Sequence, residues 1–172
     1  MNPMQKTRLA KVTLNIGAGK DQAKLEKGIQ LIKAITGIEP VKTITQKRIP
    51  SWGVRPGLPI GCKLTLRKEK AKEVLKRLFV AKDNVLKLNN VDSFGNVSFG
   101  IEEYIDIPGV PYDPKIGVLG LQVCITLEKP GFRIKHRKVR AKKIPKKHSV
   151  KKVDAVNFLK DEFNVKIEGE RT

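Results

Sequence analysis

The residues best suited to chemistry in this sequence are the lysines and arginines gathered between positions 133 and 152. These 20 residues, RIKHRKVRAKKIPKKHSVKK, contain 11 Lys and Arg and no Asp or Glu, and they carry more than half of a formal net charge of +19. Such a surface attracts a polyanion, and nucleic acid is the commonest one in a cell. Ile134, Val139 and Ile144 interrupt the run, and a helical pattern follows it. We therefore predict an ordered basic loop that acts as a docking surface, and not a flexible tail.

The side chains that commonly perform catalysis are few. His136 and His148 both lie in the basic run, and no carboxylate is near in sequence to orient either ring, so a protonated or phosphate-contacting imidazole is the favoured role. Cys62 and Cys124 lack C-x-x-C spacing and are predicted to be reduced residues of the core or the sheet. NIGAGKD matches neither glycine-rich phosphate motif, and the acidic residues lack calcium-loop spacing. We predict no catalytic residue, no metal site and no cofactor.

The composition fits a globular protein. Hydrophobic residues make up 40% and charged residues 31% of the 172 residues, a length that suits one domain over residues 1–172. No segment resembles the apolar core of a signal peptide or a membrane span, so we expect a cytoplasmic protein.

Hydrophobic periodicity predicts the order of the elements. Residues 9–17 and 62–67 alternate apolar and polar positions, which is typical of half-buried strands, and a helical pattern follows each. Asp21 is the predicted N-cap of the first helix and Gly37 its C-terminal stop. A further strand spans 118–128, and a final helix covers about 150–163, with Ser149 as N-cap and Val153 on its packed face. Residues 46–61 hold three prolines and three glycines and are predicted to form an irregular loop.

Polar side chains alternate with the apolar ones on these strands and point away from the predicted helices. We take as candidate contacts Lys11, Thr13, Asn15, Lys63, Thr65 and Arg67, together with Thr43 and Thr45 of a short strand after Pro40. Cationic groups suit phosphates, and short polar groups suit sugar hydroxyls and base edges, as in RNA binding. An ordinary solvated face is the alternative, but such faces usually mix both charge signs, and the two main strands carry no acid.

Two features limit the kind of RNA contact. Aromatic content is 5%, and none of these strands carries an outward Phe or Tyr for stacking, which favours recognition of a folded RNA by shape. Residues 83–132 carry seven acidic and three basic side chains and are not expected to face phosphate.

Several stretches of the chain resemble the archaeal form of the ribosomal protein L5 family, the 5S rRNA-binding protein of the large subunit. They are VTLNIGAG, TGIEPVKT, LPIGCKLTLR, FGNVSFGIEEYIDIPGVPYDP and LEKPGFRIKHRKVRAKKIPKKH. The resemblance implies an α+β fold in which helices pack on one face of an antiparallel sheet and the open face binds 5S rRNA in the central protuberance. Asn15 and Thr65 match family contacts to that RNA. Ile38 stands where the family has a glutamine, so that one hydrogen bond is expected to be missing.

The resemblance also implies partners for the two long loops. Residues 46–60 match a loop that contacts the P-site tRNA, with Lys47, Arg48, Trp52 and Arg55 as candidates; Trp52 either packs on its own loop or stacks on RNA. The basic run would lie against 23S rRNA through Arg133, Lys135, Arg137, Lys138, Arg140, Lys142, Lys143, Lys146 and Lys147. Other ribosomal proteins of the 5S particle would be neighbours.

Two other classes of function compete with this interpretation. An RNA-processing or RNA-modifying enzyme with a basic sheet surface would show a pocket with convergent titratable groups and displaced pKa values. A peripheral binder of anionic membranes would need an amphipathic helix with large apolar residues beside the basic run, and the sequence has none there.

Overall fold

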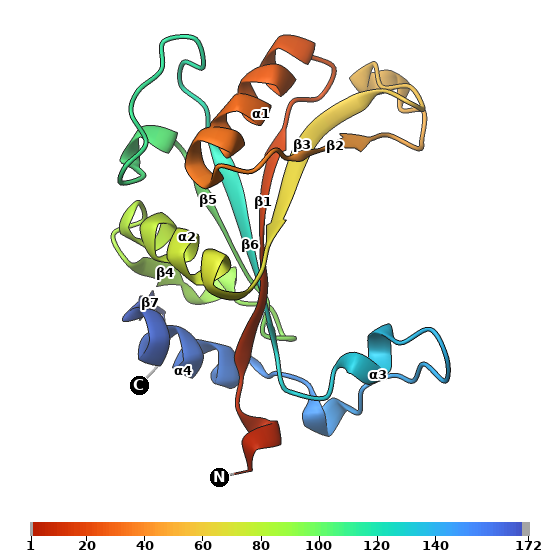
Figure 1. The fold of residues 1–172 in the computed structure, drawn as a ribbon, viewed down its shortest axis with the longest axis vertical. Coiled ribbons are helices and arrows are strands. Elements are labelled where there is room, and N and C mark those ends of the chain that lie inside the picture. The colour runs from red at the N-terminus through yellow and green to blue at the C-terminus, as the bar shows by residue number, and fades with distance from the viewer. Residues whose placement is uncertain (1, 170–172) are drawn as a thin grey trace.

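The computed structural model describes residues 2–169 and contains a five-stranded sheet in which all neighbouring strands are antiparallel. Its order is β2-β3-β1-β6-β5, and Figure 1 shows the strands running along the long axis of the molecule. The strands are β1 (Arg8–Gly17), β2 (Val41–Ile44), β3 (Pro59–Leu66), β5 (Val97–Ile101) and β6 (Leu121–Glu128). A parallel pair, β4 (Val85–Lys87) with β7 (Lys166–Glu168), lies beside the sheet.

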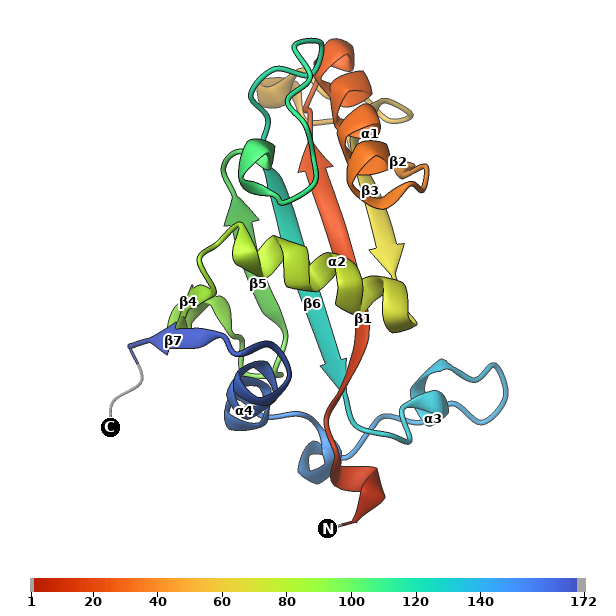
Figure 2. The same cartoon turned by 60° about the vertical axis from the view of Figure 1, so that its left-hand side comes forward.

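The two longest helices lie on the same face of the sheet, as Figure 2 shows, and leave the other face open. They are α1 (Gln22–Thr36) and α2 (Lys68–Val80); α4 (Lys152–Phe163) packs near the end of the sheet where β1 begins. Short helical turns complete the described chain: α3 (Arg133–His136), η1 (Pro3–Gln5), η2 (Pro50–Trp52), η3 (Leu88–Asn90), η4 (Tyr104–Asp106) and η5 (Lys146–His148). The predicted α+β class with helices on one face is confirmed.

The first strand and helix form as their sequence predicts. Val12, Leu14 and Ile16 are buried on the helical side of β1. The Asp21 carboxylate accepts the backbone N–H groups of Ala23 and Lys24 at 2.9 and 3.2 Å, and Gly37 ends α1 in the left-handed conformation. These caps fix both ends of the helix that covers β1 and β3.

Aromatic residues join the last helix to the rest of the core. The ring of Phe79 in α2 stacks on Phe99 of β5 with centroids 5.5 Å apart and meets Phe163 of α4 at 5.3 Å. Such ring pairs stabilise the fold by more than the burial of their apolar surface alone. The chain segment that leads into α4 is therefore attached to the core at its C-terminal end.

Three predictions about local structure are wrong. Helix α4 begins at Lys152 with Lys151 as N-cap, because the Asp154 carboxylate accepts the Lys151 N–H at 3.2 Å, whereas the Ser149 hydroxyl donates to the Lys146 carbonyl. Val153 is 67% exposed instead of packed. Within 46–61, residues Pro50–Trp52 form η2 and residues 59–61 already belong to β3, so this segment is not irregular throughout.

Candidate nucleic-acid interface

The candidate residues of the two main strands meet on the open face. In the antiparallel register Thr13 lies opposite Thr65, and Asn15 lies opposite Lys63. Directly opposed residues share one face of a sheet, and the buried residues between them point to the other. Lys11 continues the same row of β1, so five predicted contacts form one polar surface.

The remaining candidates of this group lie at its margin. Thr43 of the edge strand β2 is opposite Gly61, where a Cβ would come within 3.1 Å of the Thr43 hydroxyl. Arg67 is exposed just beyond β3, as the N-cap residue of α2. The Thr45 hydroxyl lies past the end of β2 and is buried without a hydrogen-bond partner in the described chain. The apolar Ile38 side chain is partly buried against the core, so this position offers no side-chain hydrogen bond to RNA.

Sequence reasoning missed half of the open face. Strand β6 lies on the other side of β1 and places Gln122 opposite Asn15, Cys124 opposite Thr13 and Thr126 opposite Lys11. Strand β5 adds Ser98 beside Cys124. Residues 83–132 are not expected to face phosphate, and that stays a prediction, but these two strands do form part of the open face. The alternation of apolar and polar residues over 121–128 indicates these outward side chains, but the acidic charge balance of residues 83–132 as a whole argues against an RNA-binding role.

A side-chain hydrogen bond across the sheet orders two amides on this face. The Asn15 amide Nδ2 donates to Gln122 Oε1 at 3.1 Å. An amide side chain has two N–H donors and an acceptor oxygen with two lone pairs, so one bond leaves donor and acceptor capacity on both residues. The pair is therefore oriented and still able to bind a ligand.

Charge is distributed unevenly over the open face. Lys11 and Lys63 lie on the β1 and β3 side, and within residues 2–169 none of the predicted RNA-contacting cations takes part in an ion pair. At the β5 side a groove of about 1090 Å³ borders the face, and its lining is acidic in balance: it includes Asp83, Glu102, Asp106 and Glu168 against Lys82 and Lys87. A polyanion would therefore be held on β1 and β3 and repelled from the β5 edge.

The predicted tRNA-contacting loop is an ordered tip on the β2–β3 hairpin. Ile49 and Val54 exchange backbone hydrogen bonds of 3.0 and 3.1 Å, and Val54 is buried. Trp52 is 69% exposed, so it does not pack on its own loop. Lys47, Arg48 and Arg55 are exposed as well.

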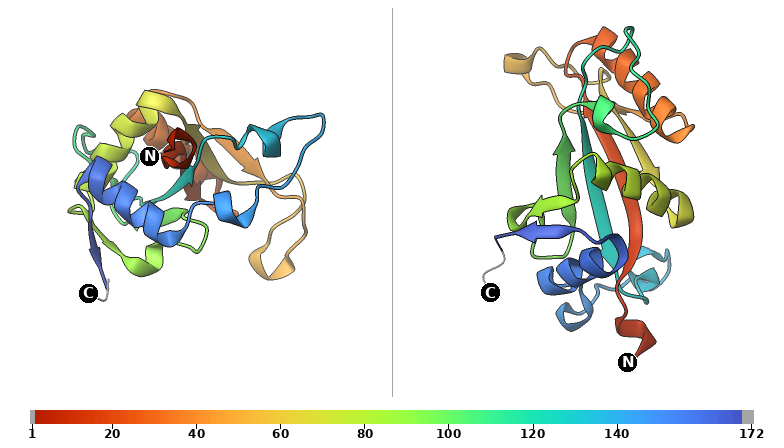
Figure 3. Two further views of the ribbon diagram at one scale, coloured as in Figure 1. Left: turned by 90° about the horizontal axis from the view of Figure 1, so that it is seen from below. Right: turned by 90° about the vertical axis from the view of Figure 1, so that its left-hand side faces the viewer.

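The basic segment, residues 133–152, projects from the opposite end of the sheet. It begins with α3 after β6, and Figures 1 and 3 show it on the side of the molecule away from β4 and β7. All nine predicted 23S-contacting residues are exposed. The Lys142 N–H donates to the Ile134 carbonyl at 3.2 Å, and the Arg137 Nε donates to the Arg140 carbonyl at 2.8 Å, so the segment folds back on itself.

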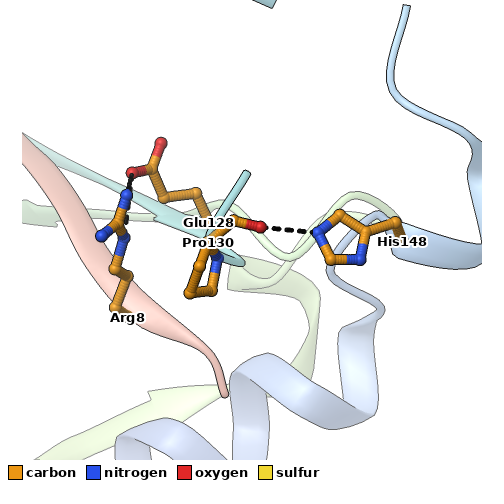
Figure 4. A network of polar contacts seen from close by, with 4 residues as sticks. All are labelled: Arg8, Glu128, Pro130 and His148. Carbon is orange, nitrogen blue, oxygen red and sulfur yellow. Dashed lines mark hydrogen bonds and ion pairs between the residues drawn. The ribbon is translucent and has the colours of Figure 1, made fainter. Parts of the chain in front are cut away.

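Polar contacts close the base of the basic segment. The Lys129 ammonium and the Asp154 carboxylate, which flank it, lie 2.7 Å apart. His148 Nε2 lies 2.7 Å from the Pro130 carbonyl, and Arg8 pairs with Glu128 nearby, as Figure 4 shows. Because a carbonyl only accepts, His148 Nε2 is the protonated nitrogen in this bond. This nitrogen therefore holds the chain in position, and phosphate contact by His148 stays a prediction.

The displaced pKa values have structural causes. Burial raises the pKa of the Cys62 thiol, which lies under the sheet. Burial also acts to raise the pKa of Asp154, but the hydrogen bond from Lys129, the Lys151 N–H and the two nearby ammonium charges together lower it below its ordinary value. No cluster of three or more His, Cys, Asp or Glu within residues 2–169 could hold a metal ion. No helix in this range is long and apolar enough to cross a membrane.

Comparison with known proteins places both halves of the chain in one family. Residues 2–55 match ribosomal protein L5, and residues 59–158 match the C-terminus of the same ribosomal family. Strand β1 lies in the first stretch and pairs with β3 and β6 of the second, so the open face needs both.

Full-length relatives come from archaea. The chain is similar to the large ribosomal subunit protein uL5 of Sulfurisphaera tokodaii, with 49% identity over 168 residues that cover 97% of this chain and 95% of the relative. It is 45% identical to the protein of the same name from Methanosphaera stadtmanae over 98% of this chain and all of the relative. The Nanoarchaeum equitans protein is 44% identical over 96% of this chain and 98% of its own length.

Proposed function

The chain belongs to the ribosomal protein L5 family, and from this premise we propose that it is a structural protein of the large ribosomal subunit whose open face binds 5S rRNA. As a member of a family of ribosomal proteins, it is not an enzyme. The observation that carries the proposal is the row of Lys11, Thr13 and Asn15 beside Lys63 and Thr65, with no acid among them.

The chemistry of this surface supports RNA as its ligand. Lysines supply charge for phosphates, while the Asn15–Gln122 pair and the threonine hydroxyls supply donors and acceptors for sugar hydroxyls and base edges. Strands β1 and β6 contain no aromatic residue, so this part of the face offers no ring for base stacking, which favours recognition of a folded RNA by its shape.

Direct binding to purified 5S rRNA tests this assignment. Asn15→Ala and Thr65→Ala each remove a polar group that would face the RNA, and losing one buried hydrogen bond costs about 1–3 kcal/mol, or roughly 5- to 150-fold in affinity. Asn157→Ala on the exposed side of α4 is the matched control and should bind like the unchanged protein. Unchanged affinity of both sheet variants would remove the open face from the interface.

The two projecting segments are assigned to other RNAs of the particle. We propose that the hairpin tip contacts P-site tRNA through Lys47, Arg48, Trp52 and Arg55, and that the basic segment lies on 23S rRNA. The exposure of Trp52 and the opposite positions of the segments on the sheet support separate ligands. A photo-crosslinker at position 55 should reach P-site tRNA in reconstituted subunits; crosslinks to 5S rRNA alone would refute the tip assignment.

A further inference from the structure

An apolar pocket lies where the basic segment meets the end of the open face. It encloses about 700 Å³, within the range of roughly 300–1,000 Å³ typical of sites for small molecular groups. Leu127 of β6, together with Ile144 and Val150 of the basic segment, supplies aliphatic surface. Thr126 belongs both to this pocket and to the open face, so the two surfaces are continuous.

The most prominent group in the pocket is Phe94, whose side chain is 70% exposed. Its turn is tightly fixed, because Asp92 Oδ1 accepts the N–H groups of Phe94 and Asn96, both at 2.8 Å. Gly95 has φ +74°, and a Cβ there would lie only 2.5 Å from Val150 Cγ1. The turn thus packs closely against the basic segment and holds a large apolar ring that lines the pocket and remains accessible to a ligand.

A second aromatic residue, Phe132, also lines the pocket. Phe132 is partly buried, and its ring centroid lies 6.5 Å from that of His148, whose ring is held by the Pro130 carbonyl. The bond between His148 and the Pro130 carbonyl, drawn in Figure 4, therefore also helps to position Phe132.

The charged groups that line the pocket all have one sign. They are Lys135, Lys142, Lys143 and Lys146, and there is no Asp or Glu among the lining residues. A ligand must therefore combine an apolar flat or aliphatic part with negative charge beside it. A nucleotide has this combination, because its base stacks on aromatic rings and its phosphates bind lysine.

We propose that this pocket binds one unstacked nucleotide of ribosomal RNA, with the base against Phe94 and the flanking phosphates on the lysines. The inference rests on the proposed function, because it adds a base-stacking site to an RNA-binding face. An acidic peptide would satisfy the same lysines, but these lysines belong to the segment assigned to ribosomal RNA, and the pocket continues into the open RNA-binding face through Thr126, which together favour RNA over a peptide. RNA would then be recognised by its shape on the sheet surface, whereas the pocket at the end of the sheet would contact one base directly.

A fluorescent reporter tests the stacking directly. Trp52→Phe combined with Phe94→Trp leaves a single tryptophan in the pocket, since the chain has one Trp. We would titrate this protein with a single-stranded RNA oligonucleotide and with an abasic oligonucleotide of equal length. Stacking should quench the fluorescence of the introduced tryptophan with the first and not with the second at equal occupancy. A control protein with Trp52→Phe and Tyr112→Trp, in the exposed loop before β6, should respond to neither.

Affinity measurements separate stacking from charge. Phe94→Ala should weaken binding of the base-containing oligonucleotide by roughly 5- to 150-fold, the range expected for removal of one base–aromatic stack, and leave the abasic one unchanged. Phe94→Leu keeps an apolar side chain and should show the same effect. Lys142→Gln with Lys143→Gln should weaken both oligonucleotides equally.

Three results would overturn the inference: equal quenching by the abasic oligonucleotide, full affinity of Phe94→Leu, or quenching by an acidic leucine-rich peptide and not by RNA. Measuring 5S rRNA binding with the same variants separates the pocket assignment from the proposed function. If Phe94→Ala leaves the affinity for the base-containing oligonucleotide unchanged while Asn15→Ala weakens 5S rRNA binding, the pocket assignment fails and the proposed function stands. If the unchanged protein binds neither RNA, the proposed function itself fails.

Discussion

Replacing Lys138 and Lys147 by glutamine should reduce the salt dependence of 23S rRNA binding without changing the preference for 5S rRNA over unrelated RNA. Both lysines are exposed, neither takes part in an ion pair, and neither lines the apolar pocket. A lysine ammonium neutralises phosphate as a point charge and lacks the fixed fork of arginine. Its contribution should therefore be electrostatic and independent of RNA sequence.

The expected magnitude follows from counterion release. Removing one lysine–phosphate interaction should reduce the slope of log K against log salt by about 0.7 to 0.9, so removing two should reduce it by roughly 1.4 to 1.8. Between about 50 and 200 mM salt, such a change in slope corresponds to a roughly tenfold smaller drop in affinity for the variant than for the unchanged protein. Because only two lysines are replaced, the salt slope should not change by more than this amount.

Filter binding to a 23S rRNA fragment at several salt concentrations measures the slope. Lys24→Gln with Lys27→Gln is a matched control, because it removes the same charge from the exposed surface of α1, on the helical side of the sheet. The control should keep the original slope. An equal drop in both variants would refute a localised contact, and disappearance of the preference for 5S rRNA would show that the basic segment reads 5S rRNA itself.

Three further perturbations test how the structure holds these surfaces. Asp154→Asn should lower the free energy of unfolding by about 1–2 kcal/mol near pH 7. This is the contribution of a charged hydrogen bond, reduced because the Asp154 side chain is 34% exposed. Because the pKa of Asp154 is lowered in the folded protein, this contribution is present above the ordinary carboxyl pKa and is lost as pH falls through the folded one, so urea denaturation at low pH should show a smaller difference. Gly95→Ala should cost about 2–4 kcal/mol in the same assay, since its Cβ would meet Val150 and its φ is positive. Trp52→Ala should change stability by less than about 0.5 kcal/mol, because the ring is exposed, while weakening the footprint on P-site tRNA in reconstituted subunits.

Local patterns predicted the parts of the fold that depend on neighbours in sequence. Alternation in β1 and β3 identified which residues are buried, and the Asp21 and Gly37 caps mark the ends of α1. Ser149 has good capping chemistry, so the sequence predicts it as the N-cap of α4, but Asp154 instead accepts the Lys151 N–H and pairs with Lys129. That partner is 25 residues away and invisible to a local rule.

Strand order accounts for what sequence reasoning missed on the open face. Strand β6 is far from β1 in sequence, yet it forms a side of the surface, so Gln122 becomes the partner of Asn15. The apolar pocket has the same origin: Phe94, Phe132 and Ile144 come from separate parts of the chain. No pattern within one loop could reveal that they enclose a common space.

The one-sided fold explains why these surfaces can be both polar and ordered. The helical face of the sheet carries the core, and the aromatic contacts of Phe79 extend that core to α4, so the open face does not need a covering layer for stability. The basic segment follows β6 and precedes α4, and both of its ends are therefore attached to the core. The Lys129–Asp154 and His148–Pro130 contacts then restrict its base. A highly charged segment held in this way loses less conformational entropy when it binds than a free tail would, and this favours an ordered docking surface for RNA.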